Sequence, residues 1–152
     1  RGAGLRKKCA FKVYEAVLYC AEGAALPPDP YPALVTGNLP KRIEMHFLRD
    51  VDHGKILEAW DDAMKNAIRD GKLPADSEAN QAQFLGYFSD RDLSEGQVIT
   101  LTWLPGTGLL TTIGEDEFPA IDDLALASAL FAVWLGDDPI SGDLKKDLLR
   151  LR

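Results

Sequence analysis

The fold of this chain is decided at its start, by GAGLRKK (residues 2–8) and the run CAFKVYEAVLY (residues 9–19) that follows directly. Two glycines separated by one residue give the backbone the freedom for a tight bend. The run after it is rich in β-forming residues and contains neither Gly nor Pro. We therefore predict a bend at residues 2–4 that leads into one long strand. Apolar side chains occur on both faces of that strand, so we expect both faces to be covered.

Arg6 and Tyr14 are the residues of this stretch that suit an anionic head group. A guanidinium matches a carboxylate with two parallel hydrogen bonds, and a phenol adds one further donor. A straight strand would hold the two residues roughly 26 Å apart. A shared ligand therefore requires a bend or bulge near Lys8 or Cys9. The alternative is that Arg6 is a solvated turn residue and that Tyr14 is an ordinary strand aromatic.

Composition limits the class of protein. A chain of 152 residues is long enough to bury a core as a single domain over residues 1–152. Its 24 acidic residues outnumber 17 basic ones and give a net charge of −7, which opposes binding to nucleic acid and to anionic lipid surfaces. No apolar run approaches the ~20 residues of a membrane span. Cys9 and Cys20 would lie roughly 36 Å apart on one extended strand, so no disulfide is expected between them.

The remaining periodicity predicts further strands and helices. The order of these elements does not alternate as in a parallel α/β protein, so the fold class is α+β, an antiparallel sheet layered with helices. The expected elements are a strand at 41–48, a helix from Asp52 to Ile68, a helix from 76 or 77 to 88, strands at 97–104 and 109–113 joined by a turn at 105–108, a short strand at 115–118, a helix capped by Asp122 and ended by Gly136, and a helix capped by Ser141.

Several motifs, taken in order, resemble the chalcone isomerase superfamily, and within it the bacterial chalcone isomerase-like branch. They are residues 2–6 with 11–19, residues 41–51, residues 104–108 and residues 134–141. The resemblance implies a large curved antiparallel sheet under a layer of helices, with a ligand cleft between them. It also implies that an N-terminal export signal has been removed and that the protein is periplasmic.

The resemblance assigns a role to Arg6 and Tyr14. In the fatty-acid-binding relatives of plant chalcone isomerase, an arginine after the glycine turn and a tyrosine on the next strand hold the carboxylate, and these two residues match those positions. The true isomerases have a threonine where this chain has Tyr14. Their catalytic tyrosine and asparagine have no match around residues 60–66, and near Ala127 only the adjacent Ser128 is hydroxylated.

We therefore expect non-catalytic binding of a fatty acid or similar amphipathic carboxylate, with no catalytic residues. One alternative is an isomerase or lyase that acts on a chalcone-like phenolic substrate. Another is a structural or interaction domain whose cleft is filled by its own side chains. No cofactor or metal is expected, because His46 and His53 are the only histidines and have no metal-binding spacing. No feature specifies an oligomeric state.

Two other patterns have ordinary structural interpretations. The turn Pro105-Gly106-Thr107-Gly108 lacks the lysine of a phosphate-binding loop and joins two expected strands, so it is interpreted as a hairpin turn. The tryptophans at positions 60, 103 and 134 are candidates for pocket lining, but aromatic residues on amphipathic elements more often belong to the core.

Overall fold

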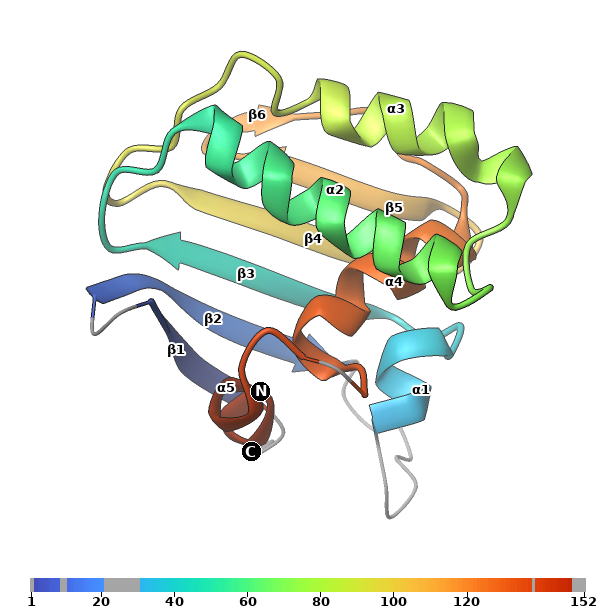
Figure 1. The fold of residues 1–152 in the computed structure, drawn as a ribbon, viewed down its shortest axis with the longest axis horizontal. Coiled ribbons are helices and arrows are strands. Elements are labelled where there is room, and N and C mark those ends of the chain that lie inside the picture. Colours follow the sequence, from blue (N-terminus) through green and yellow to red (C-terminus); the bar gives the residue numbers. More distant parts are fainter. Residues whose placement is uncertain (1, 9–10, 21–30, 138, 149–152) are drawn as a thin grey trace.

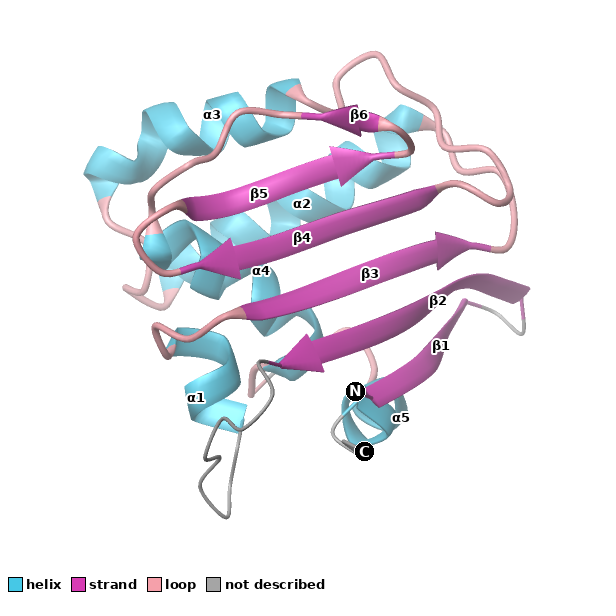
Figure 2. Ribbon diagram, turned by 180° about the vertical axis from the view of Figure 1, so that it is seen from behind, coloured by secondary structure: helices cyan, strands magenta, loops and turns pink. Residues whose placement is uncertain are grey.

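The computed structural model describes residues 2–8, 11–20, 31–137 and 139–148. Antiparallel strands form one six-stranded sheet in the order β1-β2-β3-β4-β5-β6, with helices over one face (Figure 1), and the view from behind shows the other face uncovered by helices (Figure 2). The predicted α+β fold is confirmed. The elements are β1 (Gly2–Lys8), β2 (Phe11–Cys20), α1 (Tyr31–Thr36), β3 (Lys41–Phe47), α2 (His53–Arg69), the 3-10 turn η1 (Ala75–Ser77), α3 (Glu78–Gly86), β4 (Val98–Leu104), β5 (Gly108–Ile113), β6 (Asp116–Glu117), α4 (Leu124–Leu135) and α5 (Gly142–Leu148).

The predicted bend at residues 2–4 is wrong. Residues Gly2–Lys8 form the edge strand β1, which pairs antiparallel with β2, so the chain reverses between Lys8 and Phe11. The glycine at position 4 serves close packing. A Cβ atom there would lie 2.7 Å from Leu144 Cδ1 of α5 and 2.9 Å from Asp147 Cβ. Glycine thus lets α5 approach the backbone of β1.

Alternation along the central strands separates the two faces of the sheet. On β3, Ile43, Met45 and Phe47 are buried on the helix side, as their period of two predicts. The outer face carries polar side chains between them: Glu44 accepts a hydrogen bond from Tyr19 and lies 3.0 Å from the Nε2 atom of His46. Because polar groups on this face bond to one another, the sheet tolerates an uncovered side.

The predicted hairpin at residues 105–108 is confirmed. Thr107 N donates to Leu104 O at 3.0 Å, and Gly106 and Gly108 have φ values of 82° and 116°. Such positive values strain any residue with a side chain. At Gly108 a Cβ atom would also lie 2.7 Å from Ile121 O, so this position excludes a side chain for a second reason.

Helix α2 begins where the sequence predicts. The side chain of Asp52 accepts a hydrogen bond from Lys55 N and caps the helix. Its buried side chains are Ile56, Trp60, Met64 and Ala67. Ile68, the apolar residue at the expected end of this helix, lies outside the core, because 51% of the residue is exposed.

Helix α4 is buried on most sides, as its apolar sequence predicts, but its ends differ from expectation. Asp123, not Asp122, caps it, because Asp123 Oδ1 accepts from Leu126 N. Gly136 ends it with φ −73°, so the glycine is not required by a left-handed backbone. A Cβ atom at this position would instead lie 2.7 Å from Ala132 O. Ser141 caps the next helix by accepting from Leu144 N, as predicted.

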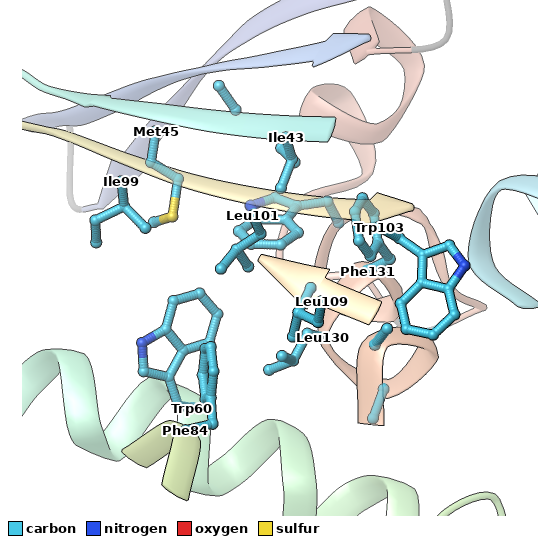
Figure 3. Packing of buried hydrophobic residues seen from close by; sticks show 14 of the residues in the cluster. Ile43, Met45, Trp60, Phe84, Ile99, Leu101, Trp103, Leu109, Leu130 and Phe131 are labelled. Atoms are coloured by element: carbon cyan, nitrogen blue, oxygen red, sulfur yellow. The ribbon is translucent and has the colours of Figure 1, made fainter. Parts of the chain in front are cut away.

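One hydrophobic core fills the space between the sheet and the helices. Figure 3 shows Trp60 and Phe84 extending from the helix layer toward Ile99 and Leu101 of the sheet. The ring of Trp60 contacts those of Phe84, Phe88 and Trp134 at centroid distances of 5.5, 5.7 and 5.9 Å. The tryptophan at position 60 is thus the centre of an aromatic cluster that joins three helical segments to the sheet. In the described part of the chain, no helix has the length and apolar character that crossing a bilayer requires.

Candidate functional site

The structure brings the two predicted site residues to adjacent positions. In the register of β1 and β2, Arg6 is the direct partner of Tyr14, and the register shifts between Arg6 and Lys7. A single long strand would have kept the two residues far apart. The antiparallel pairing of β1 with β2 brings their backbones together, which is the condition for a shared ligand. The bend or bulge is expected near Lys8 or Cys9; Cys9 lies outside the described residues, and so does the side chain of Arg6.

Tyr14 is buried on the inner face of the sheet, with 6% of the residue exposed. Trp134 Nε1 of α4 donates a hydrogen bond to its hydroxyl oxygen at 3.0 Å. The ring of Phe47 lies 5.5 Å away, on the strand that pairs with the other side of β2. Burial and a fixed hydrogen bond hold the phenol in one orientation, which suits a group that positions a ligand.

Helix α5 covers the inner face of β1 beside this position. Leu144 and Leu148 are buried there, and Gly4 pairs with Ala16 directly below Leu144. Lys145 Nζ donates to Gly136 O at 2.8 Å and ties α5 to the end of α4. The site therefore lies where the first two strands meet the last two helices.

The interior next to Tyr14 is filled by aromatic rings. Trp134 contacts both Tyr14 and Trp60: its Nε1 bonds to the hydroxyl of Tyr14, and its ring is in edge contact with that of Trp60. Sequence reasoning missed Trp134 as a partner of Tyr14, because 120 residues separate them and no local pattern signals the contact. The indole Nε1 of Trp60 and the hydroxyl of Thr111 are buried with no hydrogen-bond partner among the described residues.

Two hollows on the described surface lie away from Tyr14. One of about 570 Å³ is bordered by Arg91, which pairs with Asp116 at 2.5 Å. The other, of about 150 Å³, is lined in part by Lys41 and Cys20. Burial lowers the pKa of Lys41 to about 8, while its Nζ donates to Val35 O and to the carbonyl of residue 37 at the end of α1. This lysine closes a helix end, so its role is structural.

The remaining sequence candidates have ordinary partners. Trp103 Nε1 donates to Asn38 Oδ1 at 2.9 Å, and 3% of this tryptophan is exposed, so it belongs to the core. The Nδ1 atom of His53 lies 2.7 Å from Asp92 Oδ1, and this hydrogen bond raises the pKa of the imidazole. Among the described residues, no three His, Cys, Asp or Glu side chains form a group that could hold a metal ion.

Comparison with known proteins gives a family and a structural neighbour. The sequence profile described as chalcone isomerase-like matches residues 1–150. Among solved structures, the chain is similar to a fatty-acid binding protein of Arabidopsis thaliana, with a TM-score of 0.77 and 18% sequence identity over 97% of this chain and 84% of that one. At this identity the likeness shows a shared fold. No curated protein matches in a sequence search.

Proposed function

The chain belongs to the chalcone isomerase-like family, and we propose that it binds a fatty acid or a similar amphipathic carboxylate without catalysing a reaction. The observation that carries the proposal is the direct pairing of Arg6 with Tyr14 on neighbouring strands. Directly paired residues of antiparallel strands project from the same face of a sheet. The guanidinium and the buried phenol are thereby proposed to hold one carboxylate.

The structural neighbour supports the proposal by analogy. The Arabidopsis protein is a fatty-acid binding protein, and its fold extends over 97% of this chain. Folds host many functions, so the analogy gains weight only through the residues at the site. The match of Arg6 and Tyr14 to the carboxylate-holding positions of such relatives supplies that link.

The acyl chain is proposed to extend from Tyr14 along the inner face of the sheet into the aromatic interior. This region is apolar and begins beside the head-group position, since Phe47 and Trp134 contact Tyr14 and Trp60 contacts Trp134. These rings are closely packed, so binding requires them to move apart. Each buried methylene would contribute up to about 0.8 kcal/mol. Affinity should therefore rise with chain length until the interior is full.

The test is calorimetry with saturated fatty acids of increasing length and the matching alcohols. Arg6→Ala should weaken the binding of the acids by roughly 1.5–3 kcal/mol, because charge-assisted hydrogen bonds are lost. The binding of the alcohols should weaken much less. Arg6→Lys should restore charge without the planar fork and recover part of the loss. Arg69→Ala is the matched control, since Arg69 lies at the far end of α2 with 68% of its side chain exposed.

Two outcomes would refute the proposed binding of a fatty acid at Arg6 and Tyr14. Equal weakening of acids and alcohols by Arg6→Ala would indicate a general disturbance of the fold. An affinity that does not change with the length of the acyl chain would show that the protein has no apolar binding site for that chain.

The filled interior favours a second candidate, a structural or interaction domain that takes no ligand. The ring of Trp60 contacts those of Phe84, Phe88 and Trp134 where a tail would lie. Native mass spectrometry on protein purified without detergent separates the two candidates. A retained mass in the range of a fatty acid supports the binding protein, and failure of added fatty acids to bind supports the filled domain.

We also propose a bacterial periplasmic location, which rests on the resemblance of the sequence motifs to exported relatives. Fractionation of cells that express the complete gene tests it. Recovery of the protein with cytoplasmic markers would refute the location without affecting the binding proposal.

A further inference from the structure

The aromatic cluster contains a polar group that no described residue satisfies. Trp60 is 3% exposed, and its indole N–H has no acceptor among the described residues. The other two tryptophans differ in this respect: Trp103 donates to Asn38 and Trp134 donates to Tyr14. A buried donor without a partner destabilises a protein, because the group has lost its hydrogen bond to water.

A second unpartnered group occurs on the sheet that faces this cluster. Thr111 on β5 is 1% exposed, and its hydroxyl has no partner among the described residues. Leu109 and Ile113, which share its face of the strand, belong to the same hydrophobic core as Trp60. An N–H donor and a hydroxyl are thus both buried in one core without a partner among the described residues.

The aromatic neighbours of Trp60 supply no acceptor for its N–H. The rings that contact Trp60 are those of Phe84, Phe88 and Trp134. The single polar atom on those rings, Trp134 Nε1, is already bonded to Tyr14. An oxygen carried by a ligand is positioned by the rest of the ligand and needs no further partners.

We propose that the ligand of this domain is an oxygenated amphipathic acid, with a hydroxyl or keto oxygen on its apolar part that accepts a hydrogen bond from Trp60 Nε1 and contacts the Thr111 hydroxyl. This inference rests on the proposed carboxylate site at Arg6 and Tyr14. It adds the class of acid and names the residues that select it. A site built to bond a substrate oxygen discriminates strongly against the analogue that lacks it, because its buried polar groups are then left unpaired.

The arrangement of the core links the two ends of such a ligand. Trp134 bonds to the hydroxyl of Tyr14 at 3.0 Å, and its ring centroid lies 5.9 Å from that of Trp60. A carboxylate at Tyr14 and an oxygen at Trp60 would therefore both lie beside residues that contact Trp134. The oxygen belongs to the interior part of the chain, away from the carboxylate.

The experiment compares palmitic acid with a series of palmitic acids that carry one hydroxyl or keto group at successive positions. Calorimetric titrations use the wild-type protein, Thr111→Val and Trp60→Phe. The controls remove a hydroxyl and an indole N–H that already have partners elsewhere. The first control is Thr102→Val, since the Thr102 hydroxyl accepts a hydrogen bond from Arg42 on the outer face of the sheet. The second is Trp103→Phe, since the Trp103 N–H donates to Asn38.

One position of oxygenation should bind the wild type about tenfold more tightly than palmitic acid, the value of one hydrogen bond of ordinary strength. Thr111→Val and Trp60→Phe should reduce that preference, while the two control variants should leave it unchanged. Thr111→Val exchanges a hydroxyl for a methyl group, so it keeps the test valid if Trp60→Phe fails to fold.

Three outcomes would overturn the inference. If all oxygenated acids bind no better than palmitic acid while Arg6→Ala still weakens the acids, the carboxylate site stands and the second contact is absent. If a preference exists but survives both Thr111→Val and Trp60→Phe, the oxygen binds elsewhere. If no acid binds at all, the proposed function fails and this inference fails with it.

Discussion

Replacing Tyr14 by Phe tests the hydrogen bond that joins the first hairpin to α4. The substitution keeps the ring and its contact with Phe47 but leaves the Trp134 N–H buried without this acceptor. An unsatisfied buried donor costs about 1–3 kcal/mol of unfolding free energy. In a domain of this size each kcal/mol shifts the melting temperature by about 2–4 °C, so a loss of about 2–12 °C is expected.

The assay is urea unfolding followed by far-ultraviolet circular dichroism, with thermal melts in parallel. Tyr87→Phe is the matched control. The Tyr87 hydroxyl accepts a hydrogen bond from Gln83 and donates one to Pro119 O, and both of these bonds are exposed. Water can replace an exposed partner, so this control should change stability by no more than about 0.5 kcal/mol.

A double-mutant cycle with Trp134→Phe isolates the pair. Trp134→Phe alone also removes ring volume from the core, so its own effect mixes two causes. The coupling energy between the two substitutions should be at least about 0.5 kcal/mol. A loss for Tyr14→Phe no larger than that of Tyr87→Phe, together with a coupling energy near zero, would refute the reasoning.

Three further predictions follow from single contacts or missing motifs. Gly4→Ala should destabilise the protein and increase amide hydrogen exchange in α5, because the added Cβ would lie 2.7 Å from a side-chain carbon of that helix. Gly86→Ala is the control, since a Cβ at Gly86 would meet no atom within 4 Å. Equal effects of the two substitutions would contradict the packing argument. At Asp123, partial burial raises the pKa, but hydrogen bonds from Ser77, Leu126 N and Asn80 outweigh it, so the pKa of the carboxyl lies below 3.8. The stabilisation by the Asp123 carboxylate is therefore fully present above about pH 3.8, the unfolded value, and is lost as pH falls through the lower folded pKa. The unfolding free energy measured against pH should show this loss in the wild type and less of it in Asp123→Asn. Identical curves for the two proteins would refute the prediction. Because the catalytic positions of the true isomerases have no match, loss of chalcone absorbance at high protein concentration should stay below the ordinary enzyme range of about 1–1000 turnovers per second, and a rate within that range would favour the isomerase alternative.

The sequence predicts those parts of the fold that local physics determines. The alternation of Ile43, Met45 and Phe47 requires only that one face of a strand is buried, and it is confirmed. The cap at Asp52 and the turn at Gly106 depend on a few neighbouring residues, and both lie where predicted. Such features need no information about distant parts of the chain.

Glycines were misinterpreted because two different causes favour the same residue. The sequence predicts a conformational role for both Gly4 and Gly136, the first in a bend and the second at the end of a helix. In the structure Gly4 makes room for α5, and Gly136 makes room for Ala132 O. Close approach to another segment depends on tertiary packing, so local sequence cannot distinguish it from conformational freedom.

The candidate site shows the same division. The chemistry of Arg6 and Tyr14 is visible in the sequence, but their pairing depends on a chain reversal that the expected single strand lacked. The contact of Tyr14 with Trp134 spans 120 residues. That the Trp60 N–H has no acceptor among the described residues emerges only from the three-dimensional arrangement, because the sequence cannot show which partners surround a buried donor.

The location of the site has a consequence for how a ligand would act on the protein. The first two strands carry Arg6 and Tyr14, while α4 carries Trp134, and α5 packs against β1 beside them. A ligand held at Arg6 and Tyr14 and in contact with Trp134 would bridge the two ends of the described chain. Binding to the folded state alone raises stability by mass action. This increase in stability should therefore extend to α5, which contacts no proposed ligand atom but packs against the same two strands.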